Sequence, residues 1–193
     1  KEIEKIKFNK RELGDFLKQY RNTHWVENKD YKQVTVSQTG EISYRGTKHG
    51  SKIGRKRQFI IDLKNHPHTL IFIRQGVYKG GIGICPKEVD GCIVTENMPM
   101  FDIVNINPKF LQYYIRSFLF KREVSKLVPF GAAQKAVHER DLLKVDFLVP
   151  ELKDQEKIVQ LLDKVEMIKK SFKENKDHTD KLFDAVLKES FEP

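Results

Sequence analysis

The chain has 193 residues, 39% of them hydrophobic and 33% charged, with a formal net charge of +9. This hydrophobic content suffices for a packed core. No run of 18 apolar residues occurs, and residues 1–7 lack the apolar segment of a secretory signal, so we expect neither a membrane span nor a signal peptide. The pair Cys85 and Cys92, with no Cys or His pair nearby, is typical of reduced thiols, not of metal ligands. We therefore expect a cytoplasmic protein without a membrane partner or a metal.

The excess positive charge belongs to the first 150 residues. Residues 151–193 carry 9 Lys+Arg and 11 Asp+Glu, which leaves 27 basic and 16 acidic side chains for residues 1–150. Such an asymmetry favours a polyanionic partner for the first part and a salt-bridged, nearly neutral surface for the second. A basic surface that serves only solubility is the alternative.

The first predicted elements are a short helix and a hairpin. Asn9 and Glu12 resemble a capping box, and the helix that would follow has Leu13, Phe16, Leu17 and Tyr20 on its apolar face. After residue 22 the hydrophobic period changes to two, which predicts strands around residues 34–36 and 42–44, joined by a turn at 38–41.

A basic segment follows this hairpin. Residues 42–61 contain no acidic side chain, and glycines at positions 46, 50 and 54 interrupt both a helix and a regular strand. We therefore predict a mobile loop that contacts phosphate groups, although a ligand-free surface loop is also compatible with the pattern. Its candidate contact residues are Arg45, Lys48, His49, Lys52, Arg55, Lys56 and Arg57.

Short apolar segments then predict strands at 70–74, 81–85, 92–95 and 100–104. Asn107 and Pro108 predict the start of a helix that continues to about Val124, with Leu111, Tyr114, Ile115, Phe118 and Leu119 on its buried face. The glycines of residues 76–83 match neither nucleotide-binding pattern and are better explained by turns.

The last quarter of the chain predicts a strand and a long helix. Val145, Phe147 and Val149 alternate up to Pro150, and from about Lys153 no Gly or Pro occurs until Pro193. A helix of roughly 37 residues would be about 55 Å long and would project from a domain of this size. Its apolar residues follow a heptad pattern, a coiled-coil seam that needs a partner helix. The seam consists of Ile158, Leu161, Val165, Ile168, Phe172, Asn175, Thr179, Leu182 and Val186.

The sequence contains no convincing catalytic site. The Asn/Asp-Pro-Pro-aromatic motif of DNA methyltransferases is missing, because Asn107-Pro108 lacks the second proline. A Mg²⁺-dependent DNA nuclease would need an acidic pair followed by lysine, and Asp146 with Glu151 and Lys153 is the nearest match. The segment from His138 to Asp141 is better interpreted as a polar turn than as a catalytic triad.

Several motifs together resemble the target recognition domain of specificity subunits in type I restriction-modification systems. They are Leu13-Gly14-Asp15, Gly76-x-x-x-Gly80, Gly131-x-x-Gln134-Lys135, Asp141-Leu142, the strand ending at Pro150, and Gln155-x-x-Ile158 before a long helix. The resemblance implies a non-catalytic DNA-reading domain followed by a spacer helix that docks methyltransferase subunits, in a complex that also contains restriction subunits. A full specificity subunit has two such units in tandem. This chain, with one, is either a natural half-length subunit or half of a longer protein.

We therefore expect an α+β fold, in which residues 1–150 form a twisted mixed-sheet target recognition domain and residues 151–193 a long helix. The expected partners are double-stranded DNA and a second copy of the chain in an antiparallel homodimer, or the other half of a full subunit. No cofactor is expected. Besides the basic segment, the predicted DNA-binding residues are Arg74, Gln75, Lys79, Gln134 and Lys135. A small nuclease and a coiled-coil scaffold with a basic head remain the alternatives.

Overall fold

A computed structural model describes residues 6–128 and 136–191. Eleven strands lie in the described part, together with short 3₁₀ turns and four α-helices. The strands are β1 (Phe8–Glu12), β2 (Leu17–Tyr20), β3 (Thr23–Trp25), β4 (Asp30–Val36), β5 (Ile42–His49), β6 (Arg57–Ile60), β7 (Thr69–Phe72), β8 (Ile82–Ile84), β9 (Ile93–Val94), β10 (Met100–Ile103) and β11 (Asp146–Pro150). The helices are α1 (Pro108–Arg116), α2 (Phe118–Ser125), α3 (Glu139–Leu142) and α4 (Leu152–Phe191).

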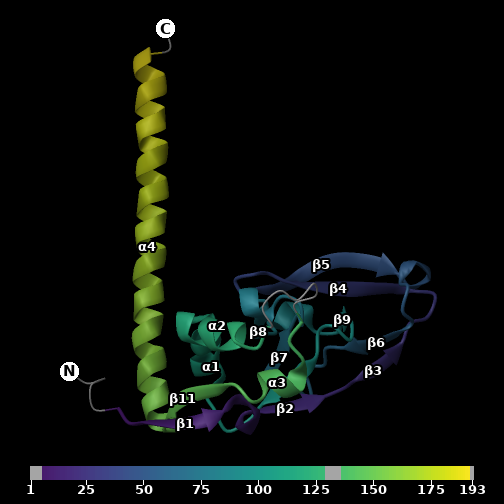
Figure 1. Cartoon of the computed structure of the whole chain (residues 1–193). Coiled ribbons are helices and arrows are strands. Elements are labelled where there is room, and N and C mark those ends of the chain that lie inside the picture. Colours follow the sequence, from purple (N-terminus) through teal and green to yellow (C-terminus); the bar gives the residue numbers. More distant parts are fainter. Residues whose placement is uncertain (1–5, 129–135, 192–193) are drawn as a thin grey trace.

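The strands form three sheets, with the orders β1-β11, β2-β10-β7-β8 and β3-β6-β9-β4-β5. All pairs are antiparallel except β4 with β9. The helix α4 stands at one side of this globular part, beside α1 and α2, and projects far beyond it (Figure 1). The predicted α+β class with a mixed sheet and a long C-terminal helix is confirmed.

Two main cores hold the globular part together. The larger one packs β2, β7 and β10 against α1, α2 and β11, around fully buried Phe72, Phe101 and Phe120. The second lies between the five-stranded and the four-stranded sheet and includes Val34, Val36 and both cysteines, which are buried free thiols. Burial raises the pKa of the Cys85 thiol to about 12, so this group stays neutral.

The predicted N-terminal helix is wrong. Residues 8–12 pair instead as β1 with β11, and the pairing continues where Leu13 N–H donates to the Val145 carbonyl at 2.9 Å. Leu13, Phe16 and Leu17 are buried as expected, but on a short 3₁₀ turn and β2. A capping pattern stabilises a helix end only weakly, so pairing with a strand more than 130 residues away decides the conformation.

The predicted hairpin is confirmed, with Val34 opposite Tyr44 and Val36 opposite Ile42. The predicted mobile loop is wrong over its first part, because β5 continues through Gly46 to His49. Gly46 lies beside a β-bulge and has a φ of 134°, a backbone conformation that residues with a side chain rarely adopt. The glycine therefore allows β5 to continue through this position. Part of the basic segment is therefore an edge strand.

The predicted strands around residues 70, 82, 93 and 100 are confirmed as β7 to β10. The single helix predicted up to Val124 is wrong, because it breaks at Ser117. That residue is extended (φ −70°, ψ 154°), and its hydroxyl oxygen accepts a hydrogen bond from Phe120 N–H, which starts α2. The break turns Phe118 and Leu119 to solvent and buries Phe120 and Val124 instead.

The junction between β11 and α4 contains a buried glutamine. The alternation of Val145, Phe147 and Val149 is confirmed, and α4 begins at Leu152, one or two residues before the predicted start at Lys153 or Asp154. The Gln155 side chain is 2% exposed; its Oε1 accepts from Asn107 N–H at 2.8 Å, and its Nε2 donates to the Pro150 carbonyl at 2.9 Å. These bonds attach the base of α4 to both β11 and the start of α1.

Candidate nucleic-acid interface

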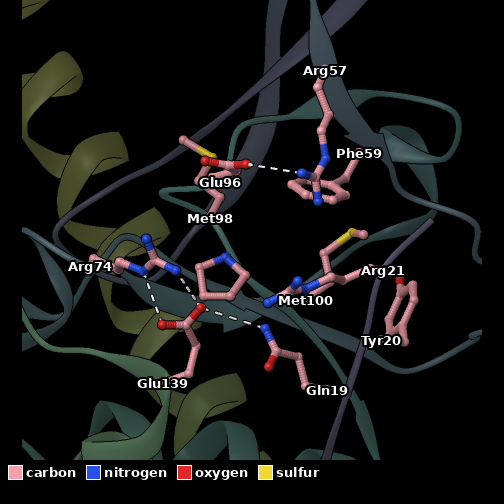
Figure 2. Close-up of a pocket in the computed structure, with 11 residues that line it drawn as sticks. Gln19, Tyr20, Arg21, Arg57, Phe59, Arg74, Glu96, Met98, Met100 and Glu139 are labelled. Atoms are coloured by element: carbon pink, nitrogen blue, oxygen red, sulfur yellow. Dashed lines mark hydrogen bonds and ion pairs between the residues drawn. The ribbon is translucent and has the colours of Figure 1, made fainter. Parts of the chain in front are cut away.

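A cavity of about 260 Å³ opens where the two larger sheets meet. Its wall combines three arginines and two glutamates with apolar side chains, as Figure 2 shows. The lining residues come from the end of β2, from β6, from the segment that leads into β10, from the turn after β7 and from the start of α3: Gln19, Tyr20, Arg21, Arg57, Phe59, Arg74, Glu96, Met98, Pro99, Met100 and Glu139. Residues from five separate parts of the chain therefore share one opening.

Two arginine–glutamate pairs lie in this wall. Arg74 Nε donates to Glu139 Oε2 at 3.0 Å while Arg74 Nη2 bonds the other oxygen of the same carboxylate. Arg57 Nη1 lies 4.0 Å from Glu96, whose other oxygen pairs with Arg55. The Arg57 guanidinium also lies 5.7 Å above the ring of Phe59. Both arginines line the cavity, and a guanidinium group is a side chain that can recognise guanine bidentately.

The Arg74–Glu139 pair is partly buried, with side-chain exposures of 26% and 14%. Burial is the largest single influence on the pKa of Glu139 and opposes its ionisation. The hydrogen bonds from Arg74 and from the backbone N–H of Glu139, together with the positive charge of Arg74, outweigh burial in sum, so the pKa of Glu139 lies below its ordinary value. Both partners are therefore charged at neutral pH. The Val137 N–H also donates to the Arg74 carbonyl, so Arg74 attaches the segment before α3 through both its main chain and its side chain.

Replacing Glu139 by glutamine should destabilise the protein at pH 7 and hardly at all in acid. A lowered folded-state pKa contributes stability that is present above the unfolded pKa, about 4.3, and is lost as the pH falls through the folded value. Glu139→Gln should cost about 1–3 kcal/mol at pH 7, because Arg74 loses its charged partner. Urea unfolding from pH 7 to pH 3 measures this, with exposed Glu174→Gln as the control. An equal loss at both pH values would contradict the assignment.

Tyr20 forms one side of the cavity and is supported from behind. The His66 ring stacks on it with centroids 3.7 Å apart, and Asp102 holds His66 Nδ1 at 2.8 Å. The Tyr20 hydroxyl shares a 2.7 Å hydrogen bond with the Thr69 hydroxyl, and burial raises the Tyr20 pKa to about 12. Tyr20 therefore stays neutral, and these contacts keep its ring in place.

The predicted DNA-binding residues divide into two groups. Arg57 and Arg74 line the cavity, and the sequence reasoning missed their partners Glu96 and Glu139, which lie 39 and 65 positions further along the chain. No local pattern signals such pairs. Part of the positive charge of the basic segment is therefore neutralised, because Glu96 pairs with Arg55 and Arg57.

The other residues of the basic segment do not line the cavity. Arg45 and Lys48 on β5 and Lys52 in the following turn are exposed and pair with no acidic side chain of the described residues. His49 contacts Asp30 at 2.8 Å and Asn28 at 2.9 Å. Lys56 Nζ donates to the Gly50 carbonyl at 2.7 Å. Arg45, Lys48 and Lys52 are thus available to phosphate, whereas His49 and Lys56 stabilise the end of the hairpin.

The remaining predictions concern the turn after β7 and the segment before α3. Gln75 is exposed in that turn, and Lys79 Nζ lies 5.7 Å from the ring centroid of Tyr78. Gln134 and Lys135 lie outside the described residues. Gln19 and Arg21, which the sequence reasoning missed, join Arg57 and Arg74 at the cavity.

The predicted seam of α4 lies open. Ile158 is partly buried against the larger core, whereas the seam residues from Leu161 to Val186 are exposed, with Phe172 at 71% and Ile168 at 55%. At 100° per residue the seam points about 110° away from Gln155, Val159 and Leu162, which face the globular part. Thr179 Oγ1 donates to the Asn175 carbonyl one turn earlier. A second helix can therefore pack along α4 without meeting the globular part of its own chain.

The residues of the nuclease hypothesis do not form a site. Asp146 opens β11 and pairs with Lys10 at 2.7 Å, while Glu151 follows the last residue of that strand. At about 3.3 Å per residue the Cα atoms of the two residues lie about 16 Å apart, too far for their carboxylates to share a Mg²⁺ ion. Within residues 6–128 and 136–191 no group of three His, Cys, Asp or Glu side chains is arranged to hold a metal. In the same residues no helix is both long and apolar enough to cross a membrane.

Comparison with known proteins identifies related structures. No family model matches the chain, and no curated protein matches it. A chain from a structure on complex assembly and conformational transition of the type I R-M system is similar, with 19% identity, a TM-score of 0.66 and coverage of 96% of this chain and 50% of that one.

Two further solved structures are similar. The HsdS subunit from Thermoanaerobacter tengcongensis matches with 18% identity and a TM-score of 0.64, over 94% of this chain and 49% of that one. The type I restriction-modification S subunit from M. genitalium matches with 14% identity and a TM-score of 0.54, over 94% and 45%. This chain spans about half the length of the structures that it matches. It therefore has the fold of the specificity subunits of type I restriction-modification systems, over one half of their length.

Proposed function

We propose that the chain is a non-catalytic DNA-specificity subunit of a type I restriction-modification complex. In this proposal residues 1–150 read one half of a bipartite DNA target, and residues 151–193 form the spacer that sets the distance to the other half. The observation that carries it is the shared fold over nearly the whole chain, which unites an arginine-lined cavity and a projecting, seamed helix in one molecule.

The proposed contacts to DNA have two parts. Arg45, Lys48 and Lys52 bind phosphates from the edge of the five-stranded sheet. Arg57 and Arg74 face base edges at the cavity, where a guanidinium can bind guanine O6 and N7 while the paired carboxylate accepts from the cytosine amino group. Each arginine–glutamate pair is thus complementary to a G·C pair. In free protein the same carboxylates reduce the attraction of these arginines to any passing phosphate, which favours specific over non-specific binding.

The proposed partners of α4 are a second copy of the chain and the methyltransferase subunits, with restriction subunits joining through the complex. The exposed seam supports the first, since an isologous antiparallel pair covers both seams at once. Residues of both helices that stay outside the seam remain accessible to the methyltransferase. The chemistry of methylation and cleavage then belongs to these other subunits.

Removal of the three unpaired charges should flatten the salt dependence of DNA binding. The triple variant Arg45→Ala, Lys48→Ala, Lys52→Ala should lower the slope of log K against log salt by about 2.7, because each lost phosphate contact removes about 0.9. Fluorescence anisotropy with duplex DNA between 50 and 200 mM salt measures the slope. Lys170→Ala, Lys173→Ala, Lys181→Ala removes equal charge from α4 away from the seam and serves as the control. If both variants shifted the slope equally, net charge and not this strand would carry the binding.

The proposed function itself is tested by selection from a random DNA pool, with the wild-type chain alone and with its methyltransferase subunit. A two-part motif separated by unread bases is the expected result. An uninterrupted motif, or retention of DNA without any motif, would refute it.

A further inference from the structure

The attachment of α4 to the globular part has two levels. At its base, Gln155 and Val159 are buried, and Gln155 bonds Asn107 and Pro150. Beyond Asp163 every α4 side chain that the structure describes is exposed. A helix of 40 residues, about 60 Å long, is therefore held only within its first four turns.

The upper level of this attachment is a polar cluster between α1 and α4. Lys109 Nζ lies 2.7 Å from Asp163 Oδ2, and the Tyr113 hydroxyl donates to Asp163 Oδ1 at 2.6 Å. Tyr113 also reaches Glu166 Oε2 at 3.1 Å, and Arg116 Nη1 lies 3.5 Å from the other oxygen of Glu166. Positions 109, 113 and 116 share one face of α1, so a whole helix face is directed at α4.

The protonation states suit this cluster. Burial, with the hydrogen bonds to Asp163 and Glu166, raises the pKa of Tyr113, so its hydroxyl keeps its proton. The hydrogen bonds from Lys109 and Tyr113 lower the pKa of Asp163, so it remains an acceptor. The single hydroxyl proton of Tyr113 is shared between two carboxylates that lie one turn apart on α4. Tyr113 thereby connects the two halves of the cluster.

We propose that Lys109, Tyr113 and Arg116 with Asp163 and Glu166 form a clamp that fixes the direction of α4, and thereby the separation of the two DNA half-sites. A rod held only at its base can pivot, whereas a second attachment about 16 Å higher, from Gln155 to Glu166, prevents rocking. The end of α4 lies about 54 Å above Gln155, so rocking about that base by about 10° would move the end by about 9 Å, close to three base pairs. These are positioning residues, and the part about half-sites rests on the proposed function.

The direction of α4 can be measured without DNA. Spin labels at Lys87→Cys on the globular part and Asp177→Cys on α4 report their distance distribution by pulsed electron resonance, since both native cysteines are buried. Labelled protein is diluted with unlabelled protein, so that only distances within one chain contribute. Tyr113→Phe and the double variant Tyr113→Phe, Asp163→Asn should broaden the distribution progressively, towards about 6 Å of extra spread for a 10° rock, because position 177 lies about 33 Å above Gln155. Glu174→Gln, which removes an ion pair within α4 to Lys170, should leave it unchanged.

Charge reversal separates the clamp from general stability. Lys109→Glu places two like charges together and should broaden the distribution, while Lys109→Glu with Asp163→Lys restores an opposite pair and should narrow it again. A thermal melt of each variant shows whether it is folded at the measuring temperature. Distributions in the clamp variants as narrow as in Glu174→Gln, or a swapped pair no narrower than Lys109→Glu alone, would overturn the clamp.

The consequence for DNA is read from the same random pool selection. Clamp variants should retain the wild-type half-site sequence but accept gaps that vary by about three more base pairs, since the half-sites are read by residues remote from the clamp. If the distance distribution broadens and the gap stays sharp, the link to half-site spacing is wrong. If even the wild type selects no two-part motif, the proposed function fails, while the spin-label distances still decide whether the clamp exists.

Discussion

Phe172→Glu is expected to prevent formation of the proposed antiparallel dimer and to leave the protein monomeric. Phe172 is the midpoint of the seam from Ile158 to Val186, so an antiparallel two-fold pair would bring the two Phe172 side chains together. Glutamate there would place two like charges in an apolar interface, and an unpaired buried charge costs several kcal/mol. Light scattering should give twice 22.7 kDa for the wild type and 22.7 kDa for the variant.

The loss of the dimer should also abolish tight binding to a bipartite site. Two linked half-site contacts exceed either alone by about 10²–10⁴-fold, so the variant should bind a two-part duplex no better than a single half-site. Met167→Glu is the matched control: Met167 is 68% exposed on the same helix but lies about 130° around it from the seam. A wild type that is monomeric at micromolar concentration, or a dimer disrupted equally by Met167→Glu, would rule out this seam as the interface.

Lengthening α4 by one heptad is expected to widen the recognised gap by about three base pairs. A second copy of residues 167–173, inserted after Lys173, adds about 10 Å to the helix and keeps the seam in phase. At about 3.4 Å per base pair, the half-sites must move apart by that number, without any change in the bases that are read. Deleting one heptad should narrow the gap equally.

The measurement is selection from a random pool with the cognate methyltransferase present, followed by sequencing. Insertion of two alanines at the same place is the control for phase: it adds only about 3 Å but turns the seam by about 200°, and should prevent pairing altogether. A gap that does not depend on the length of α4 would show that the helix does not set the spacing.

Local sequence by itself determined the elements whose signals need no distant partner. The turn at residues 38–41 favours the β4–β5 hairpin, and Asn107 starts α1 because its side-chain oxygen accepts from Lys109 N–H and Phe110 N–H. The period-two pattern correctly predicted that Val145, Phe147 and Val149 are buried in the core. Pro150 and the unbroken heptads after it predicted the start of α4 to within two residues. Each of these signals operates over a few residues, so the chain carries it wherever it folds.

Tertiary structure alone decided the elements and contacts that depend on remote segments. Residues 8–12 form a strand because they pair with β11 along their whole length. This strand pairing outweighs the weak preference of the capping pattern for a helix. The predicted helix breaks at Ser117, so that Phe120 instead of Phe118 enters the larger core. Glu96 and Glu139 reach Arg57 and Arg74 only after the two sheets meet. In the sequence alone, the arginines therefore have no visible acidic partner. The same holds for Tyr113 and Asp163, 50 residues apart. The physical reason is that a charged side chain or a strand edge pairs with any suitable group that the fold brings close to it. That group can come from any position in the sequence.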